Sequence, residues 1–575
     1  MIIPRTKKYR DNTIDEIAEL CLGSKRDREE LYLMRKRYFH FGTADYNIEC
    51  KYNRLQAHLD LVSSFLFAPD HCRYNIAAPR NAADAIIEQI EAVADEWNDT
   101  FRDSGLADLF ADSVLWALIL DSTIIKLGWN DAREELFGKM IFPSDFAVYD
   151  ETEPDLDSQE AFVHTYSLNW DNAVQRLKRA GKIKEIKQLA RYPGQYSEFR
   201  DQMPPVLANM LISQTGGPNL AGAMVGRVNV DFQAYATYQS ESNNPMVRFH
   251  EVWVWDDDTD DYAIFTKADG VDGVLSDSRE TIDAMRKADE ARASELYRGS
   301  SNLFGIEQEH PFVHVCPYRL HDFFWGKAHL DILIPLQVWT NERLQQIADL
   351  LEQNVDPTKI GSGFMGLTDE KMDALGGAGS FVYDMIPGAK VEFERPPVVP
   401  DLFAEFKEIG TIFLEASGLT ETIMGRGEQG IRSEKQGKRA VATGSGRLRK
   451  VAVGLESPLV KIGDVGLKLL QRNSKERLIT DSGTLMVPAQ LAEQKIKMRV
   501  SGHSHSPLFA DEAKEMAAGL FKTQAIDRFS LLDMTDPPNK DELKHRLKKR
   551  VAAEKQEKQQ QAAAPTKPSR PRAAA

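Results

Sequence analysis

The chain has 575 residues, more than one hydrophobic core usually organises, so several domains or layers are expected. Apolar residues make up 42% and charged residues 28%, and no apolar run approaches the roughly 20 residues that span a bilayer, so we expect no membrane association. The net charge of −15 argues against a protein that grips nucleic acid over its whole surface, because such proteins are usually basic.

The N-terminal residues MIIPRTKKYRDNT lack the apolar core of a signal peptide, so we expect synthesis and assembly in a cytoplasm. The cysteines form no C-x-x-C pair, which favours structural thiols over a metal or redox site: Cys21, Cys50, Cys72 and Cys316. The chain closes with a basic stretch, and its last part, 559–575, is rich in Pro and Ala and predicted to be disordered.

The first half predicts a mixed α+β body. Helical spacing of apolar residues dominates 13–118, and strands are predicted over 122–130 and 138–150. A helical region with basic stretches is expected over 169–215. Two alternating strands then flank the acidic turn DDDTDD, within 246–267.

From His310 the pattern changes to long helices. A strand leads into a helix on which apolar side chains form one stripe: Leu333, Leu336, Leu344, Ile347 and Leu351. Pro335 is expected to start or kink this helix. A compact insert with short β-like runs spans 354–400, and a second helix follows over 401–418.

The rest of the chain is predicted to alternate between helix and strand. A helical stretch over 433–473 contains six glycines and Pro458, so we expect it to be kinked. A strand-rich piece over 476–501 follows, and terminal helices are expected at about 509–525 and 540–558.

The loop between the second and third long helices contains a G-x-G-x-x-G pattern at Gly425, Gly427 and Gly430. A dinucleotide-binding turn must follow a buried strand and needs an acidic residue about 20 positions on. Here the loop follows a helix, and no acidic residue occurs at that distance before Glu456. The glycines are therefore interpreted as giving the loop mobility.

Other candidate sites are weak. Asp256, Asp258 and Asp260 resemble the start of a calcium loop, but the sixth position is Asp261 and the twelfth is Lys267, so a solvated hairpin turn is favoured. His503 and His505 have no third metal ligand spaced near them. Neither a Ser/His/Asp order nor a nucleophile elbow stands out. We therefore expect no enzyme activity, cofactor or metal.

The order of elements over about 310–550 resembles that of a bacteriophage portal protein, the head-to-tail connector. The resemblance is carried by PFVHVCPYRLHDFFWGKAHLDILIPLQVWTNERLQQIADLLEQNVDP, by the insert, and by DLFAEFKEIGTIFLEASGLTETIMGRGEQGIRSEKQGKRAVATGSGRLRK. It implies the following parts: N-terminal region and wing 1–325, first stem helix 326–353, clip 354–400, second stem helix 401–418, tunnel loop 419–433, kinked helix and return to the wing 434–505, crown helices 506–558 and tail 559–575.

The resemblance also implies a function. A ring of about twelve subunits would sit at one capsid vertex of a virion, among major capsid and scaffold proteins, after assembly in the host cytoplasm. Double-stranded DNA would pass through its channel, driven by a separate terminase, and a tail adaptor would dock later.

Three groups of residues are implied as sites. Acidic side chains on the second stem helix would repel phosphates and let DNA slide: Asp401, Glu405, Glu408 and Glu415, against Lys407 alone. A solvated helix face is the plain alternative. The tunnel loop would line the narrowest point: Gly425, Arg426, Gly427, Glu428, Gln429, Gly430, Arg432 and Lys435. The clip would contact terminase through Asp369, Glu370 and Lys371.

Two alternatives stay open. Another structural virion protein, such as a minor capsid or tail adaptor component, would share the lack of catalytic residues. A nucleotide-dependent enzyme would use the glycine-rich loop.

Overall fold

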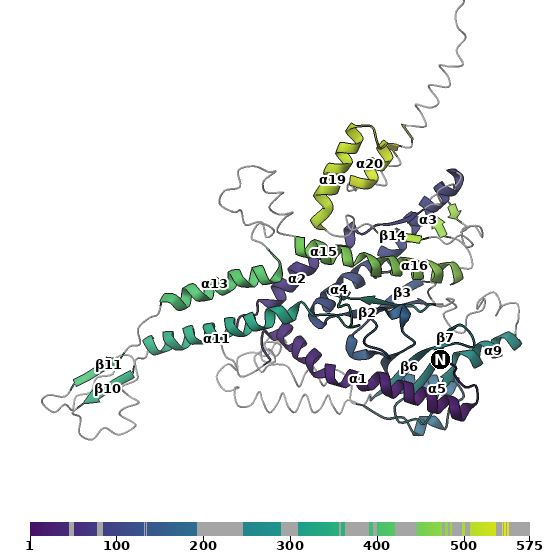
Figure 1. The fold of residues 1–575 in the computed structure, drawn as a ribbon, viewed down its shortest axis with the longest axis horizontal. Helices are drawn as coiled ribbons and strands as arrows, with labels where there is room; N and C mark the ends of the chain where they lie inside the picture. The colour runs from purple at the N-terminus through teal and green to yellow at the C-terminus, as the bar shows by residue number, and fades with distance from the viewer. Residues whose placement is uncertain are drawn as a thin grey trace, which may run out of the picture.

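The computed structural model describes residues 1–44, 51–77, 84–130, 133, 135–192, 245–288, 309–355, 358–362, 390–394, 400–419, 446–473, 478–480, 483–485, 497–500 and 507–535, with five positions between 543 and 550. The fold is mixed α+β, as predicted. Figure 1 shows a body of helices and sheets from which one pair of helices projects as an arm.

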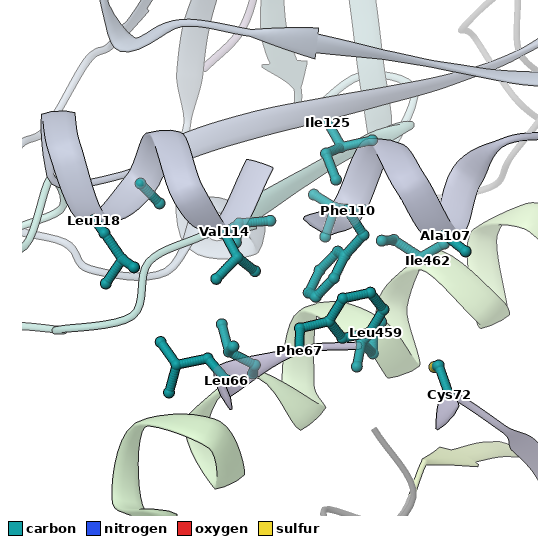
Figure 2. Packing of buried hydrophobic residues seen from close by; sticks show 14 of the residues in the cluster. Leu66, Phe67, Cys72, Ala107, Phe110, Val114, Leu118, Ile125, Leu459 and Ile462 are labelled. Atoms are coloured by element: carbon teal, nitrogen blue, oxygen red, sulfur yellow. The ribbon is translucent and has the colours of Figure 1, made fainter. Parts of the chain in front are cut away.

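Four helices open the chain: α1 (Lys7–Phe41), α2 (Leu55–Leu66), α3 (Asp84–Asp103) and α4 (Leu106–Leu120). Most of α4 is apolar, and nine of its residues are buried, most of them in the largest core, whereas Asp108 and Asp112 face solvent. Figure 2 shows Phe67 and Phe110 meeting edge to face, with ring centroids 4.7 Å apart, beside Leu459 of a later helix. The core thus joins residues far apart in the sequence.

Two antiparallel sheets build the body. The smaller has the order β3 (Glu135–Ile141), β2 (Thr123–Asn130) and β9 (Phe312–Val315). The larger has the order β4 (Phe146–Val148), β5 (Ala161–Asn169), β6 (Met246–Asp256), β7 (Asp261–Ala268) and β8 (Ser276–Asp277). Helix α1 packs on one face of the larger sheet, and α5 (Trp170–Arg179) packs on the other, because successive strand residues point to opposite faces.

Short elements complete this part of the chain. They are β1 (Tyr74–Ala77), α9 (Ser278–Ala288) and the 3₁₀ turns η1 (Pro69–His71), η2 (Pro143–Asp145), η3 (Leu156–Ser158) and η4 (Glu185–Lys187). Strand β1 pairs with β14 (Lys497–Val500), so Tyr74 lies opposite Val500. A strand from the last part of the chain therefore pairs with a strand from the first part.

The arm consists of α11 (Leu330–Val355), β10 (Thr358–Ser362), β11 (Lys390–Glu394) and α13 (Pro400–Ser417). The two strands pair antiparallel, with Thr358 opposite Glu394, and α13 runs back alongside α11 (Figure 1). The helix, strand, strand, helix order agrees with the predicted two helices and β-containing insert.

Of the two options predicted for Pro335, the start of the helix is excluded. Helix α11 begins at Leu330 and continues through Pro335. A proline inside a helix removes one backbone hydrogen bond. Here the loss falls within the first turns, where Leu330 and Leu333 are fully buried and hold the helix in place.

The kink predicted in the third long helix is confirmed. The described part consists of α15 (Gly446–Gly454) and α16 (Glu456–Asn473), which are separated at Leu455. Pro458 cannot donate to the carbonyl of Gly454, and its ring crowds that carbonyl. A glycine and a proline four residues apart therefore end one helix and allow another to begin.

The strand-rich piece is also confirmed, with β12 (Leu478–Thr480) and β13 (Gly483–Leu485) pairing antiparallel ahead of β14. The helix expected at about 509–525 is α19 (Pro507–Lys522). A further helix, α20 (Arg528–Thr535), was not predicted. The helix expected at 540–558 lies mostly outside the described residues, and the tail 559–575 lies entirely outside them.

Two expectations about the first half need correction or limits. The helix expected over 169–215 ends at Arg179 in its first part, and 193–215 is not described. The acidic turn is not fully solvated, because Asp256 and Asp261 are buried and Asp256 accepts a hydrogen bond of 2.7 Å from Arg279. Burying a carboxylate is tolerated when a cation pairs with it.

Three cysteines, Cys21, Cys72 and Cys316, are free and buried, as predicted for structural thiols, and Cys50 is not described. Burial raises the pKa of each of these three thiols to about 12. Within the described part of the chain, no helix is long and apolar enough to cross a bilayer.

Candidate functional site

The arm is fixed to the body by a buried arginine. Arg35 of α1 donates to both carboxylate oxygens of Asp331, at 2.9 and 2.7 Å, and to Asp121 at 2.8 Å. Asp121 follows α4 in a left-handed conformation (φ 114°). Burial raises the pKa of Asp121 to about 7, although the charge and hydrogen bond of Arg35 act to lower this pKa. One guanidinium thus joins α1, the α4–β2 junction and the first turn of α11.

Two buried amides fix the next turns of α11. Gln337 accepts from the backbone N–H of Arg54 at 3.1 Å and donates to the carbonyl of Tyr52 at 2.8 Å. Asn341, one turn further, donates to the carbonyl of Gly42 at 2.8 Å and accepts from Gln337. Buried side-chain amides that form hydrogen bonds with the backbone of another segment fix the position of the helix against that segment.

Helix α13 rests on the same segment. The Phe413 ring stacks on His58 with centroids 4.7 Å apart, and the Arg54 guanidinium lies 5.1 Å from the centroid of the Phe406 ring. Gly410 allows this approach, because a Cβ there would lie 2.6 Å from Nη1 of Arg54. Both arm helices therefore pack against the first turn of α2 and the residues just before it.

Helix α13 ends in a defined way. Gly418 has φ 77°, the N–H of Leu419 donates to the carbonyl of Leu414 at 3.1 Å, and the N–H of Gly418 donates to the carbonyl of Glu415 at 3.1 Å. This is the pattern of a Schellman cap. Leu419 is buried, so the direction in which the chain leaves α13 is fixed up to this residue.

The predicted acidic residues form one stripe along α13. Positions 401, 405, 408 and 415 are three, four or seven apart, and such residues share one side of an α-helix. Asp401, Glu408 and Glu415 are exposed, whereas Ile409 and Phe413 of the same helix are buried. The structure therefore exposes three of the four acids along one side of α13.

Glu405 differs from the other three acids. Its carboxylate lies 3.0 Å from Nε of Arg343 on α11, and its side chain is one-third exposed. It therefore links the two arm helices as well as lying on the stripe. An ion pair in this partly exposed position contributes about 1 kcal/mol or less.

The outer end of the arm exposes apolar side chains. Leu351 is 53% exposed, Val355 85% and Phe403 48%. The predicted stripe on α11 is thus buried in its inner part, at Leu333 and Ile347, but not at Leu351.

The other predicted sites cannot be placed. The tunnel-loop residues, Gly425, Arg426, Gly427, Glu428, Gln429, Gly430, Arg432 and Lys435, lie outside the described residues, and so do Asp369, Glu370 and Lys371. The same holds for His503 and His505. In the part of the chain that is described, no three His, Cys, Asp or Glu side chains are grouped so that they could hold a metal ion.

Sequence reasoning missed the anchoring residues. Arg35 and Asp121 carry no sequence pattern, because their partners lie 296 and 86 residues away along the chain. A signal did exist for Gln337 and Asn341: they are polar residues four apart on the apolar side of a helix.

Comparison with known proteins adds no relative: no protein-family model matches the chain, and no curated protein matches it.

Proposed function

We propose that this chain is the subunit of a portal-type ring, a channel through which double-stranded DNA enters and leaves a viral capsid. The observation that carries the proposal is the arm, in which two long helices flank a pair of antiparallel strands. The interrupted helix α15–α16 after the glycine-rich loop agrees with the order of parts that the resemblance implies.

The charge of the arm supports a channel role. Helix α11 carries four carboxylates and one cation, and α13 has the same balance. A channel wall that bound phosphates would release counterions and hold DNA in place. An acidic wall repels phosphates instead, so DNA can slide past it.

Ring formation needs a surface that fits a different surface on the next copy. Leu351, Val355 and Phe403 supply apolar area at the outer end of the arm. The anchoring through Arg35, Gln337 and Asn341 would keep that area in a constant position from one copy to the next. The inner stripe belongs to the core of its own subunit.

Partner and location follow from the same proposal. The ring would occupy a capsid vertex of the virion, with major capsid and scaffold proteins around it. The clip would meet the terminase large subunit during packaging and a tail adaptor afterwards. The tunnel loop, Leu419 to Ser433, would contact DNA through its basic side chains. The proposed function requires neither a bound nucleotide nor a metal ion.

The acidic stripe can be tested by reversing its charge. In an assembled ring, Asp401→Lys, Glu408→Lys and Glu415→Lys together should lengthen the residence time of threaded linear duplex DNA by roughly tenfold or more at low salt, with the difference shrinking as salt rises. Single-molecule dwell times would measure this effect.

A matched control changes three exposed acids outside the arm, Glu16→Lys, Glu19→Lys and Glu30→Lys, and should leave the residence time close to that of the unaltered ring. Equal dwell times for the two triple variants would contradict a channel role for the stripe.

A further inference from the structure

A basic surface lies on the larger sheet, outside the arm. Residues 176–191 contain seven cations and one carboxylate, in a chain whose net charge is −15. Six of these cations are exposed: Arg176, Lys178, Arg179, Lys184, Lys187 and Arg191. We refer to these six residues as the α5 basic surface. Figure 1 shows α5 in the part of the body farther from the arm tip.

The fold directs these side chains outward. Helix α5 buries Ala173 and Leu177 against the sheet, and Leu189 packs into the same cluster after η4. Ile186 also packs against this cluster, whereas the six cations lie on the exposed side of the segment. No ion pair is formed by any of the six cations with an acid in the described parts of the chain.

Two of the arginines are held in place by aromatic rings. The Arg191 guanidinium lies 4.0 Å from the centroid of the Trp170 ring. Arg176 lies 5.6 Å from the centroid of the Tyr166 ring and donates to the Tyr166 hydroxyl at 2.6 Å. A guanidinium stacked on a ring loses less side-chain freedom on binding a phosphate, and its N–H edge stays available.

We propose that the α5 basic surface binds the phosphate backbone of double-stranded DNA from outside, separately from any passage of DNA through a channel. Lysine is depleted in protein–protein interfaces, and aromatic anchors mark their centres. This surface instead has three exposed lysines and covered rings. Single-stranded binding uses free aromatic faces for base stacking. Here the Arg191 guanidinium lies over the Trp170 ring and Phe249 stacks on Tyr166, so a duplex fits better.

The test uses the full-length protein and a covalently closed circular duplex, which has no end that could enter a channel. Fluorescence anisotropy over a salt series gives the slope of log affinity against log salt. The variant Lys178→Gln, Arg179→Gln, Lys184→Gln and Lys187→Gln should weaken binding roughly tenfold or more and reduce the slope by about 3 to 4.

A matched control removes four exposed lysines elsewhere, Lys7→Gln, Lys8→Gln, Lys514→Gln and Lys522→Gln. It should bind like the parent protein. All eight substitutions are on exposed side chains, and circular dichroism checks that each variant is folded.

Two results would overturn the inference. One is equal binding by the two quadruple variants. The other is displacement of the circle by polyglutamate as effectively as by linear duplex, which would point to an acidic protein partner. Neither result depends on whether the protein forms a ring, so the inference and the proposed function can fail separately.

Discussion

Gly466 of α16 packs directly against a tryptophan ring from another helix. Trp97 of α3 is fully buried against α16, and a Cβ at position 466 would collide with its ring. Gly466→Ala should therefore lower the free energy of unfolding by about 1–3 kcal/mol. Urea denaturation measures the change.

Gly519 in α19 provides the matched control, because a Cβ there meets nothing within 4 Å. Gly519→Ala should be neutral or raise stability by up to about 1 kcal/mol, since alanine favours the helix. If Gly466→Ala were as harmless as Gly519→Ala, the close packing of α3 on α16 would be wrong.

A second residue-scale prediction concerns His314 on β9. Its ring stacks on Phe324 with centroids 4.2 Å apart, and its Nε2 has no hydrogen-bond partner. Burial, together with the nearby charge of Arg319, lowers the pKa of His314 to about 3. The folded state thus favours neutral His314, so the associated stability is complete above the unfolded pKa of about 6.5 and declines as pH falls toward 3.

His314→Phe keeps the stacked ring and removes the titrating group. The free energy of unfolding should then fall less steeply between pH 6 and pH 4 than in the parent protein, by up to about 1.4 kcal/mol per pH unit. Replacing the exposed His321 by Gln should leave the steepness unchanged. An unaltered slope in His314→Phe would show that this histidine is not held neutral by burial.

At the scale of elements, the position of the arm depends on the hydrogen bonds that hold α11 against the body. Asn341→Ala would leave the carbonyl of the buried Gly42 without its partner, and a stranded buried polar group costs about 1–3 kcal/mol. The N–H of Tyr52 would lose the same partner, but Tyr52 is an exposed residue. We expect a loss of about 1–3 kcal/mol and faster proteolysis within 51–54. Gln346→Ala, on an exposed position one turn further out, should stay within about 0.5 kcal/mol of the parent. Equal proteolysis rates would contradict the anchoring role.

Elements with a strong local pattern were predictable from the sequence. The alternation in 246–267 became the β6–β7 hairpin, and Gly454 with Pro458 interrupted the third long helix. Pro335 does not mark the start of α11, because the packing of Leu330 and Leu333 outweighs one missing hydrogen bond. Helix α20 was missed, since its eight residues are too few for a clear periodicity.

At the scale of the whole molecule, only part of the candidate site followed from sequence. The acidic stripe on α13 was readable, because its spacing depends on helix geometry alone. The attachment of the arm to the body could not be predicted, because Arg35, Asp121 and Asp331 come from three parts of the chain that are distant in sequence. The pairing of Glu405 with Arg343 also depends on how two helices pack, which local sequence does not determine.

The proposed function requires copies of this chain to close into a ring. Native mass spectrometry of the full-length protein, combined with negative-stain images, should show a closed assembly of about twelve subunits with a central hole. A monomer or dimer that persists across protein concentration and salt, including in the presence of scaffold and shell proteins, would contradict the proposed function.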